Sequence, residues 1–397
     1  MKNKLSNIVY SQYFVFFAVV AFVFARAPFR IIHGYLWAED ASVFIKQSYE
    51  FGWYSLFKPY AGYIHLLSRV IANFACMVVD VVYLPYLLSS ISLLIMGFSC
   101  CYLFNALRNF SSGVAIMVAF SPVVTPQNGE LLLTITNLQW VLCPVILIML
   151  WECSVGEFDF SNLLVRGFIL SVLTLTGPFG VFFFPFWVVF FVVNGLWRVS
   201  KSYIWVLPYF ISVSFQLWVI FNYPQKSTSL IGDHFLLTFL VQYFSDLCSF
   251  SVIHGHNHIY LNVVLGVCFF AMMIWSGWLA ECRYIALLFY IFSFMLWLIG
   301  MFRVGNLTMH LSWRADGSRY LYLPLLFMLW ANIFTYHYSI SRLAKNVSGF
   351  IILLIFVVSM TKFSLNEWPD WVVVKRAQGT YIMVPMSDGV YIKREFL

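Results

Sequence analysis

The chain has 397 residues, of which 62% are hydrophobic and only 10% are charged, with a formal net charge of +7. Soluble domains carry roughly 25% charged residues, so a chain this poor in charge cannot cover a water-facing surface, and we expect a lipid bilayer to be its solvent. The positive charges stand singly and form no basic stripe, which excludes nucleic acid as an expected partner.

Long apolar runs, taken in chain order, predict an all-α, polytopic integral membrane protein. A helix that crosses the hydrocarbon core needs roughly 20 mostly apolar residues. About eleven segments (nine to twelve) qualify, and they form a transmembrane domain over residues 1–361, followed by a short tail over 362–397. The expected spans lie near 8–25, 83–106, 112–125, 138–151, 163–177, 179–196, 203–221, 259–278, 284–302, 320–338 and 347–361.

Lysine and arginine in the short loops predict the orientation, because cytoplasmic loops carry an excess of these residues. Placing the N-terminus in the cytoplasm puts short basic connections there, with Arg108, Arg198, Lys201, Arg283, Arg342 and Lys345. The C-terminal tail then lies outside. Together with this tail, the longer outer segments, 26–82, 126–137, 222–258 and 303–319, carry 12 of the 16 acidic residues. Chemistry is therefore expected on the outer face of the membrane.

The first external loop, 26–82, contains the acidic pair Glu39 and Asp40 about a dozen residues after the first span. A carboxylate near the membrane surface can act as a general base, and partial burial would raise its pKa towards the working pH. The neighbouring Lys46 would act in the opposite direction. The alternative is a solvated first turn of a short interfacial helix, where acids suit the helix dipole.

The segment from Gly62 to Asp80 has the spacing of an amphipathic helix. His65 and Arg69 begin a polar stripe with a step of three or four residues, and apolar residues line the opposite side. The segment is too polar to cross lipid alone, so we expect it in the interface or beside a cavity, where Arg69 could hold a phosphate. The alternative is that Arg69 extends to the lipid headgroups.

Two later outer loops offer further binding groups. Glu130, Asn137 and Trp140, near TPQNGELLLTITNLQW, combine hydrogen-bonding groups with a flat apolar face, which suits a sugar; an ordinary interfacial loop is the alternative. Loop 303–319 carries three arginines, which suit a lipid-linked phosphate or diphosphate or, alternatively, lipid headgroups. These arginines are Arg303, Arg314 and Arg319.

No metal or other cofactor is assigned from the sequence. The motif HGHNH, with His254, His256 and His258, has alternating imidazoles but no carboxylate among them. A hydrated histidine loop explains it better than a catalytic metal centre. A divalent metal stays possible but unsupported.

The acidic pair in the first outer loop, the many spans and the short outer C-terminus resemble the GT-C membrane glycosyltransferases. The phrases WAED, LFKPYAGYIHLLSRVIA, TNLQW and LTGPF are most similar to the bacterial serotype-converting O-antigen glucosyltransferases. The resemblance implies Asp40 or Glu39 as the catalytic base. It also implies substrate binding by residues of the second phrase, namely Lys58, Tyr60, His65 and Arg69.

The resemblance further implies an undecaprenyl-phosphate sugar donor and a lipopolysaccharide O-antigen, or a related glycan, as acceptor. The acceptor hydroxyl would attack the anomeric carbon on the periplasmic side, and arginines would stabilise the departing phosphate. An O-antigen polymerase is the first alternative, since it also pairs outer arginines with many spans. A transporter or flippase is the second, although no paired halves and few charges at mid-membrane are visible.

Overall fold

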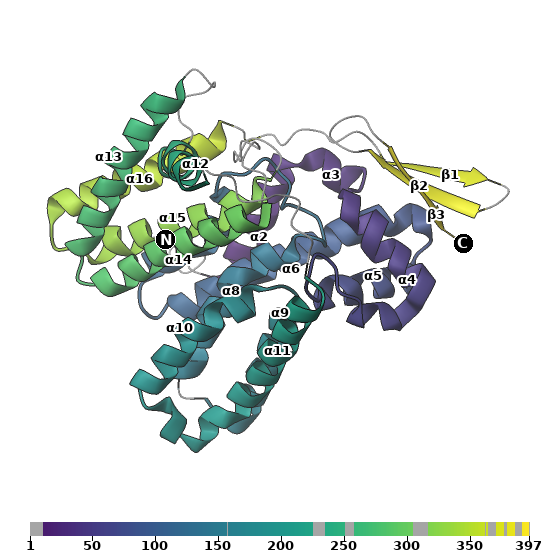
Figure 1. The fold of residues 1–397 in the computed structure, drawn as a ribbon, viewed down its shortest axis with the longest axis horizontal. Helices are drawn as coiled ribbons and strands as arrows, with labels where there is room; N and C mark the ends of the chain where they lie inside the picture. The colour runs from purple at the N-terminus through teal and green to yellow at the C-terminus, as the bar shows by residue number, and fades with distance from the viewer. Residues whose placement is uncertain are drawn as a thin grey trace, which may run out of the picture. The chain divides into compact units, whose positions relative to one another are not determined.

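A computed structural model describes residues 11–156, 158–224, 235–250, 258–304, 317–361, 363, 371–376, 379–385 and 391–396. The chain forms two compact units. Unit 1 comprises Met1–Arg26, Cys100–Leu131 and Lys226–Asn366. Unit 2 comprises Ala27–Ser99, Leu132–Gln225 and Glu367–Leu397. Helices make up most of both units (Figure 1).

Unit 1 is a helical bundle around α15 (Arg319–Tyr338), which is buried along most of its length. Two side chains of α15 bind it to α7 (Ser112–Val124). Trp330 donates from Nε1 to the Ser121 hydroxyl (2.7 Å), and the Tyr322 hydroxyl donates to the Pro122 carbonyl (3.1 Å). Such bonds satisfy polar groups that would be costly to bury alone. The other elements are α2 (Gln12–Arg26), α7 (Ser112–Val124), α12 (Phe235–Gln242), η6 (Tyr243–Cys248), α13 (Ile259–Trp278), α14 (Arg283–Val304) and α16 (Arg342–Met360).

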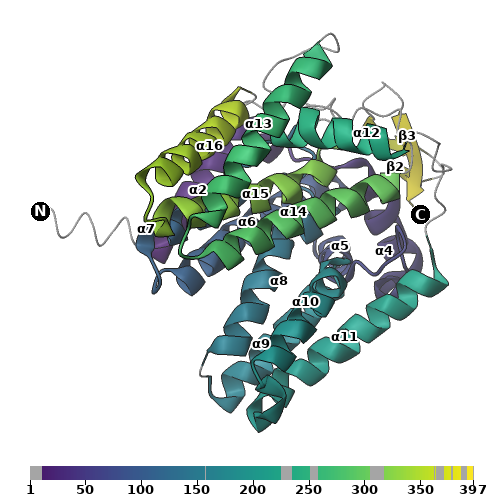
Figure 2. The same ribbon diagram turned by 60° about the vertical axis from the view of Figure 1, so that its left-hand side comes forward.

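Unit 2 contains the first outer loop and the next group of apolar helices. Helices α9 (Phe160–Thr174) and α11 (Tyr203–Asn222) lie side by side in both ribbon views (Figures 1 and 2), because Gly167 lets the backbone of Trp205 approach closely. Helix α6 (Leu84–Leu107) begins in unit 2 and ends in unit 1. The other helical elements are α3 (Pro28–Ile32), η1 (Asp40–Ile45), α4 (Lys46–Phe51), η2 (Gly52–Phe57), α5 (Leu66–Val78), η3 (Val81–Tyr83), α8 (Leu138–Val155), α10 (Phe179–Val193), η4 (Leu196–Arg198) and η5 (Ser200–Ser202).

The C-terminal tail adds a small antiparallel sheet of order β1-β2-β3, which the sequence analysis did not predict. Its strands are β1 (Val372–Arg376), β2 (Gly379–Pro385) and β3 (Tyr391–Phe396). Trp371, just before β1, donates from its indole nitrogen to the Gly34 carbonyl (3.3 Å) and packs edge-on against Tyr86. The tail therefore returns to the beginning of unit 2.

Each of the eleven segments predicted as spans contains a helix, and the amphipathic segment at 62–80 forms α5. Six helical segments of the described chain are long and apolar enough to cross a membrane. They are Val81–Leu107, Leu138–Val155, Ser200–Asn222, Ile259–Trp278, Arg283–Phe302 and Arg342–Met360. Five further apolar helices have between 10 and 17 residues, so the count of eleven spans and the orientation stay predictions.

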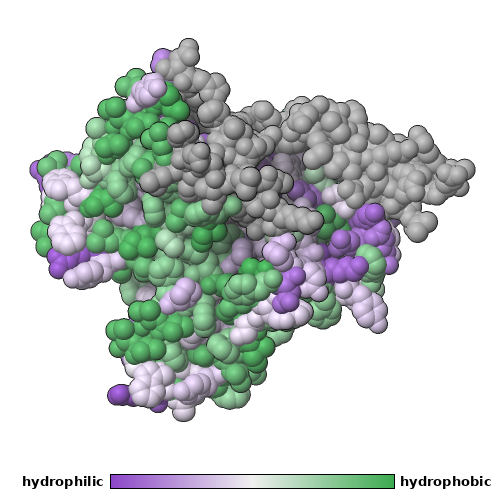
Figure 3. Space-filling view, viewed as in Figure 1, coloured by the Kyte–Doolittle hydropathy of each residue, from purple (hydrophilic) through white to green (hydrophobic). Residues whose placement is uncertain are grey.

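The surface of unit 2 carries both apolar and polar regions. Figure 3 shows hydrophobic side chains over α10 and α11, where Val193 and Phe221 are each 77% exposed, and hydrophilic side chains gathered over α4. Helix α4 presents the exposed ion pair of Lys46 and Glu50 (3.2 Å). Large apolar side chains exposed in this number need an apolar solvent, which agrees with a membrane environment.

Close approach of helices in unit 1 predicts the effect of one substitution. Gly266 of α13 lies against the backbone carbonyl of Phe244, and a methyl group there would collide with that oxygen. We expect Gly266→Ala to destabilise the protein by about 1–3 kcal/mol, because backbone cannot move aside cheaply. Gly113→Ala is the matched control, since its nearest neighbour lies 3.8 Å away, and it should cost nothing. Thermal unfolding in detergent measures both; equal midpoints would contradict the prediction.

Candidate functional site

The Asp40 carboxylate joins the first outer loop to the segment before α8. Asp40 begins the π-helical turn η1 and is completely buried. Its Oδ1 accepts hydrogen bonds from the Thr136 backbone N–H (2.9 Å) and the Thr136 hydroxyl (2.5 Å), and its Oδ2 accepts one from the Trp37 N–H (3.0 Å). The carboxylate thus receives three donors from two distant parts of unit 2.

Burial dominates the ionisation of Asp40. Removal from water raises the pKa of this carboxyl group to about 7, and the negative charge of Glu39 acts in the same direction. The hydrogen bonds from Thr136 and Trp37 favour the ionised form and limit the increase. A carboxyl group of this kind changes charge close to neutral pH.

Glu39, the other member of the acidic pair, has different surroundings. It is partly exposed, and its Oε1 accepts a long hydrogen bond from the Tyr60 hydroxyl (3.4 Å). Its Oε2 is buried and has no hydrogen-bond partner among the described residues. Buried polar atoms are nearly always satisfied, so an exception deserves an explanation such as a missing ligand.

An aromatic cluster around His65 lies beside the acidic pair. The ring centroid of His65 lies 4.5 Å from that of Tyr63, 5.4 Å from that of Phe44 and 5.6 Å from that of Tyr60. We call these four residues the His65 cluster. Tyr60 contacts Glu39 through its hydroxyl, so the cluster and the carboxylate belong to one site. Flat aromatic faces with hydroxyl groups at their rim can hold a sugar ring.

Arg69, on the first turns of α5, is only 1% exposed. Its Nη1 donates to the Gln47 side-chain oxygen (2.7 Å), and its guanidinium carbon lies 5.4 Å from the Phe44 ring centroid. The atoms Nε and Nη2 have no hydrogen-bond partner, and Arg69 makes no ion pair within the described part of the chain. Burial lowers the pKa of Arg69 to about 10, so the group stays charged at neutral pH.

A buried positive charge with two free donors is costly unless an anion compensates it. Phosphate fits the arrangement, since the guanidinium group presents parallel N–H donors to two oxygens at once. The sequence left two alternatives for Arg69, a phosphate-binding position or extension to the lipid headgroups. The side chain is buried, which argues against extension to the headgroups.

The segment before α8 holds both sides of this site. Thr136 binds Asp40, and the carbonyl of the preceding Ile135 accepts a hydrogen bond from the Ser68 hydroxyl (2.6 Å), next to Arg69. Gln139 reaches the His65 cluster by donating to the Tyr63 hydroxyl (2.9 Å). Thr136 and Tyr63 lie within the quoted phrases TNLQW and LFKPYAGYIHLLSRVIA, but the sequence assigned no role to them or to Gln47, because these roles depend on contacts between distant segments.

The remaining predicted residues of unit 2 lie in the same loops or beside them. Asn137 is buried at the N-terminal end of α8, and Trp140 packs edge-on against Phe179 with ring centroids 5.1 Å apart. Lys58 places its ammonium group 3.0 Å from the centroid of the Phe51 ring, a cation–π contact. These positions leave their predicted role in substrate binding untested.

Glu130 and Arg319 form a separate polar cluster in unit 1. Arg319 pairs with Glu130 (3.3 Å) and also donates its backbone N–H to the same carboxylate (3.3 Å). Ser318 donates its hydroxyl to Asn128 (2.6 Å). The side chain of Glu130 is only 3% exposed, so this ion pair anchors the start of α15. The Arg303 side chain and Arg314 lie outside the described residues.

Metal binding has no support within the described part of the chain, where no group of three or more His, Cys, Asp or Glu residues could hold an ion. His254 and His256 of the HGHNH motif lie outside the described residues.

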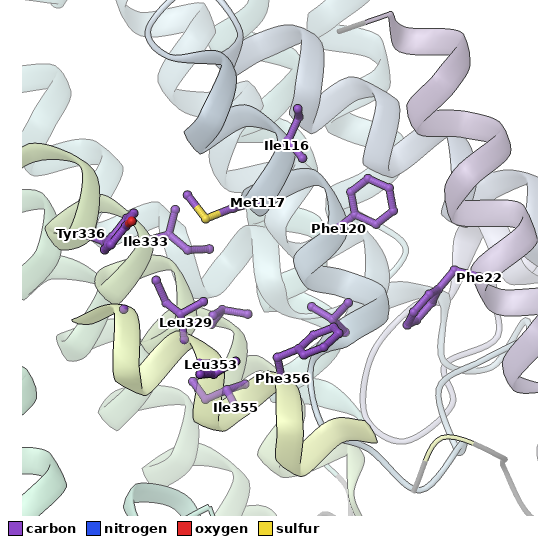
Figure 4. A pocket seen from close by; sticks show the side chains of 13 residues that line it. Phe22, Ile116, Met117, Phe120, Leu329, Ile333, Tyr336, Leu353, Ile355 and Phe356 are labelled. Carbon is purple, nitrogen blue, oxygen red and sulfur yellow. The ribbon is translucent and has the colours of Figure 1, made fainter. Parts of the chain in front are cut away.

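Unit 1 also contains an apolar cavity of about 530 Å³ between α2, α7, α15 and α16. Figure 4 shows Phe22, Met117, Leu329 and Phe356 around it, and Tyr336, which carries a hydroxyl group, also lines it. None of the lining side chains is charged, so the cavity offers no cation to hold a phosphate and no base to activate a hydroxyl. It does not compete with the His65 cluster as the place of chemistry.

No family model matches the sequence, and the search of curated proteins found no match. The resemblance to GT-C glycosyltransferases therefore stays a prediction from the acidic pair, the expected topology and the quoted sequence phrases.

The raised pKa of Asp40 predicts how stability changes with pH. The folded state binds its proton more tightly than the unfolded chain does, so the ionised group destabilises the fold, and the unfolding free energy should fall as pH rises from about 4 to about 7. One pKa unit corresponds to about 1.4 kcal/mol, so the total is at most about 4 kcal/mol. Asp40→Asn should flatten this slope in thermal unfolding measured between these pH values. Asp80→Asn, at an exposed carboxylate of the same loop, should leave it unchanged; an unaltered slope in Asp40→Asn would refute the assignment.

Proposed function

We propose that this chain is a membrane glycosyltransferase. It transfers a sugar, glucose by the resemblance, from an undecaprenyl-phosphate donor to a lipopolysaccharide O-antigen or a related surface glycan. One observation carries the proposal: the His65 cluster contacts two incompletely satisfied charged groups. Through Tyr60 it contacts Glu39, a carboxylate with an unsatisfied oxygen, and through Phe44 it contacts Arg69, a buried arginine with unsatisfied donors. The two charges form no ion pair with each other.

The chemistry of transfer needs these two groups. The acceptor oxygen attacks the anomeric carbon, the bond from that carbon to the phosphate oxygen breaks, and its electron pair stays on the polyprenyl phosphate. The acceptor proton passes to a carboxylate of the acidic pair. The phosphate gains negative charge as it leaves, and the Arg69 guanidinium is placed to stabilise that charge. No acid is needed, since phosphate leaves as a stable anion.

The membrane setting supports the same proposal. Six described helices are long and apolar enough to span a bilayer, so a lipid-linked donor could reach the protein by diffusing within the membrane. We propose a multi-pass bacterial inner-membrane protein with about eleven spans and a GT-C-like architecture. Its N-terminus would be cytoplasmic, and its acidic loop and tail periplasmic, in line with the basic short loops.

The other predicted residues take supporting parts in the proposal. Lys58, Asn137 and Trp140 are proposed to contact donor or acceptor groups near the acidic pair. Arg303, Arg314 and the Glu130–Arg319 pair of unit 1 are proposed to contact lipid headgroups. No cofactor is required for the transfer as written.

Substitution of Arg69 tests the proposal. In nanodiscs supplied with undecaprenyl-phosphate glucose and extracted lipopolysaccharide, Arg69→Gln should lower kcat/KM by about 10²–10³-fold, because an uncharged side chain cannot stabilise the departing phosphate. Arg69→Lys should retain part of the activity, since it keeps the charge but loses the second donor. Arg342→Gln, at an exposed position at the start of α16, is the matched control.

The outcomes separate the competing functions. Wild-type rates in Arg69→Gln, at equal amounts of folded protein, would contradict the proposed site. In cells, loss of glycan modification with unchanged polysaccharide length favours a side-branch transferase. A change in chain length would favour the polymerase alternative.

A further inference from the structure

We infer that the two adjacent carboxylates have separate roles: Glu39 accepts the proton of the acceptor hydroxyl, and Asp40 is a positioning residue that holds Glu39 in place. This inference rests on the proposed function and assigns the roles within the same site. It follows from the accessibility of each carboxylate and from the number of donors that each already receives.

A substrate hydroxyl cannot reach the Asp40 carboxylate. The residue is 0% exposed, and its two oxygens already accept three hydrogen bonds, from Trp37 and Thr136. Oδ2 accepts only one of these bonds, but burial closes its remaining acceptor site. A hydroxyl would have to penetrate a closed part of unit 2 to reach it.

Glu39 has the free capacity that Asp40 lacks. The residue is partly exposed, its Oε1 has only the long contact from Tyr60, and its Oε2 has no partner in the described part of the chain. The Tyr60 contact places this carboxylate at the rim of the His65 cluster, where a sugar ring is proposed to lie. A hydroxyl beside that ring would supply the hydrogen bond that Oε2 lacks.

The structure also shows how Asp40 positions its neighbour. Glu39 is the N-cap of η1, and its backbone is in the helical region (φ −77°, ψ −21°). The hydrogen bonds that the Asp40 carboxylate accepts from Trp37 and Thr136 fix the residues on both sides of Glu39, so the direction of the Glu39 side chain depends on them. A general base must first reach the proton that it removes, and of the two carboxylates Glu39 is partly exposed whereas Asp40 is buried.

In the step itself, the acceptor O–H proton moves to Oε2 of Glu39 as the oxygen forms its bond to the anomeric carbon. The carbon–oxygen bond to the phosphate breaks, and the phosphate keeps the electron pair. Glu39 then releases its proton to water. Tyr60 and Asp40 are the titratable groups that face Glu39, through the hydroxyl contact and through charge respectively.

Three single variants and one control test the division of roles in the same nanodisc assay. Glu39→Gln should lower kcat by about 10²–10⁴-fold, leave KM for the donor within about threefold and cause no fall in the thermal midpoint. Asp40→Asn should retain more activity than Glu39→Gln, keep the acidic limb of the pH–rate profile and unfold at a lower temperature than the wild type. Glu50→Gln, at an exposed ion pair with Lys46, should change none of these quantities.

Thr136→Val keeps the inference testable where Asp40→Asn does not fold, because it retains both carboxylates and removes one donor from Asp40. The Thr136 hydroxyl lowers the pKa of Asp40, so its loss would raise that pKa. If Asp40 were the base, the acidic limb of the pH–rate profile would move to higher pH. With Glu39 as the base, the acidic limb stays in place. A displaced limb in Thr136→Val, or wild-type kcat in Glu39→Gln, overturns the inference.

Failure of the proposed function would be recognised separately. A wild-type protein that transfers no sugar from this donor contradicts the proposed function itself. The thermal midpoints would still decide the structural half of the inference. If Asp40→Asn and Thr136→Val lower the thermal midpoint and Glu39→Gln does not, Asp40 is the residue that joins the loops. If Glu39→Gln lowers the midpoint and the other two variants do not, the inference is overturned.

Discussion

The hydrogen bonds between Asp40 and Thr136 join parts of the chain that are 96 residues apart, and the geometry of the candidate site depends on them. One residue earlier, the carbonyl of Ile135 accepts the bond from Ser68, so the same short segment fixes both η1 and α5. The first contact fixes the position of Glu39, which is next to Asp40, and the second fixes the position of Arg69, which is next to Ser68. A loop that alone would sample many conformations is thereby held in one, and the loss of conformational entropy is offset by buried hydrogen bonds.

Buried arginines in this protein differ in a way that separates structure from function. Arg26, which is completely buried in unit 1, donates to the Val123 carbonyl (2.7 Å) and to the Phe363 carbonyl (3.3 Å), so backbone oxygens compensate for its burial. Arg69 is buried to nearly the same degree, but it has one hydrogen bond, to the Gln47 side chain, and two donors without partners. Burial alone therefore does not mark a binding site; incomplete satisfaction of a buried charge does.

The sequence predicted the helices well, because apolar runs and a step of three or four residues report local structure directly. The stripe containing His65 and Arg69 identified α5 and its polar side. The hydrogen-bond and ion-pair partners of these residues were not predicted. No local pattern connects Asp40 with Thr136, Arg69 with Gln47 or Glu130 with Arg319, because each pair joins distant segments. The tail sheet was missed as well, because short strands separated by short turns give a weak periodic signal.

The separation of Glu39 and Arg69 is the feature that most needs a functional explanation. Two opposite charges in one weakly polar site would gain free energy by pairing, yet they form no ion pair: Glu39 contacts Tyr60, and Arg69 contacts Phe44. Folding stability would favour an ion pair, so the open arrangement has a cost. A ligand that carries an anionic group at one end and a hydroxyl at the other would satisfy both charges at once, and a glycosyl phosphate meeting its acceptor has that form.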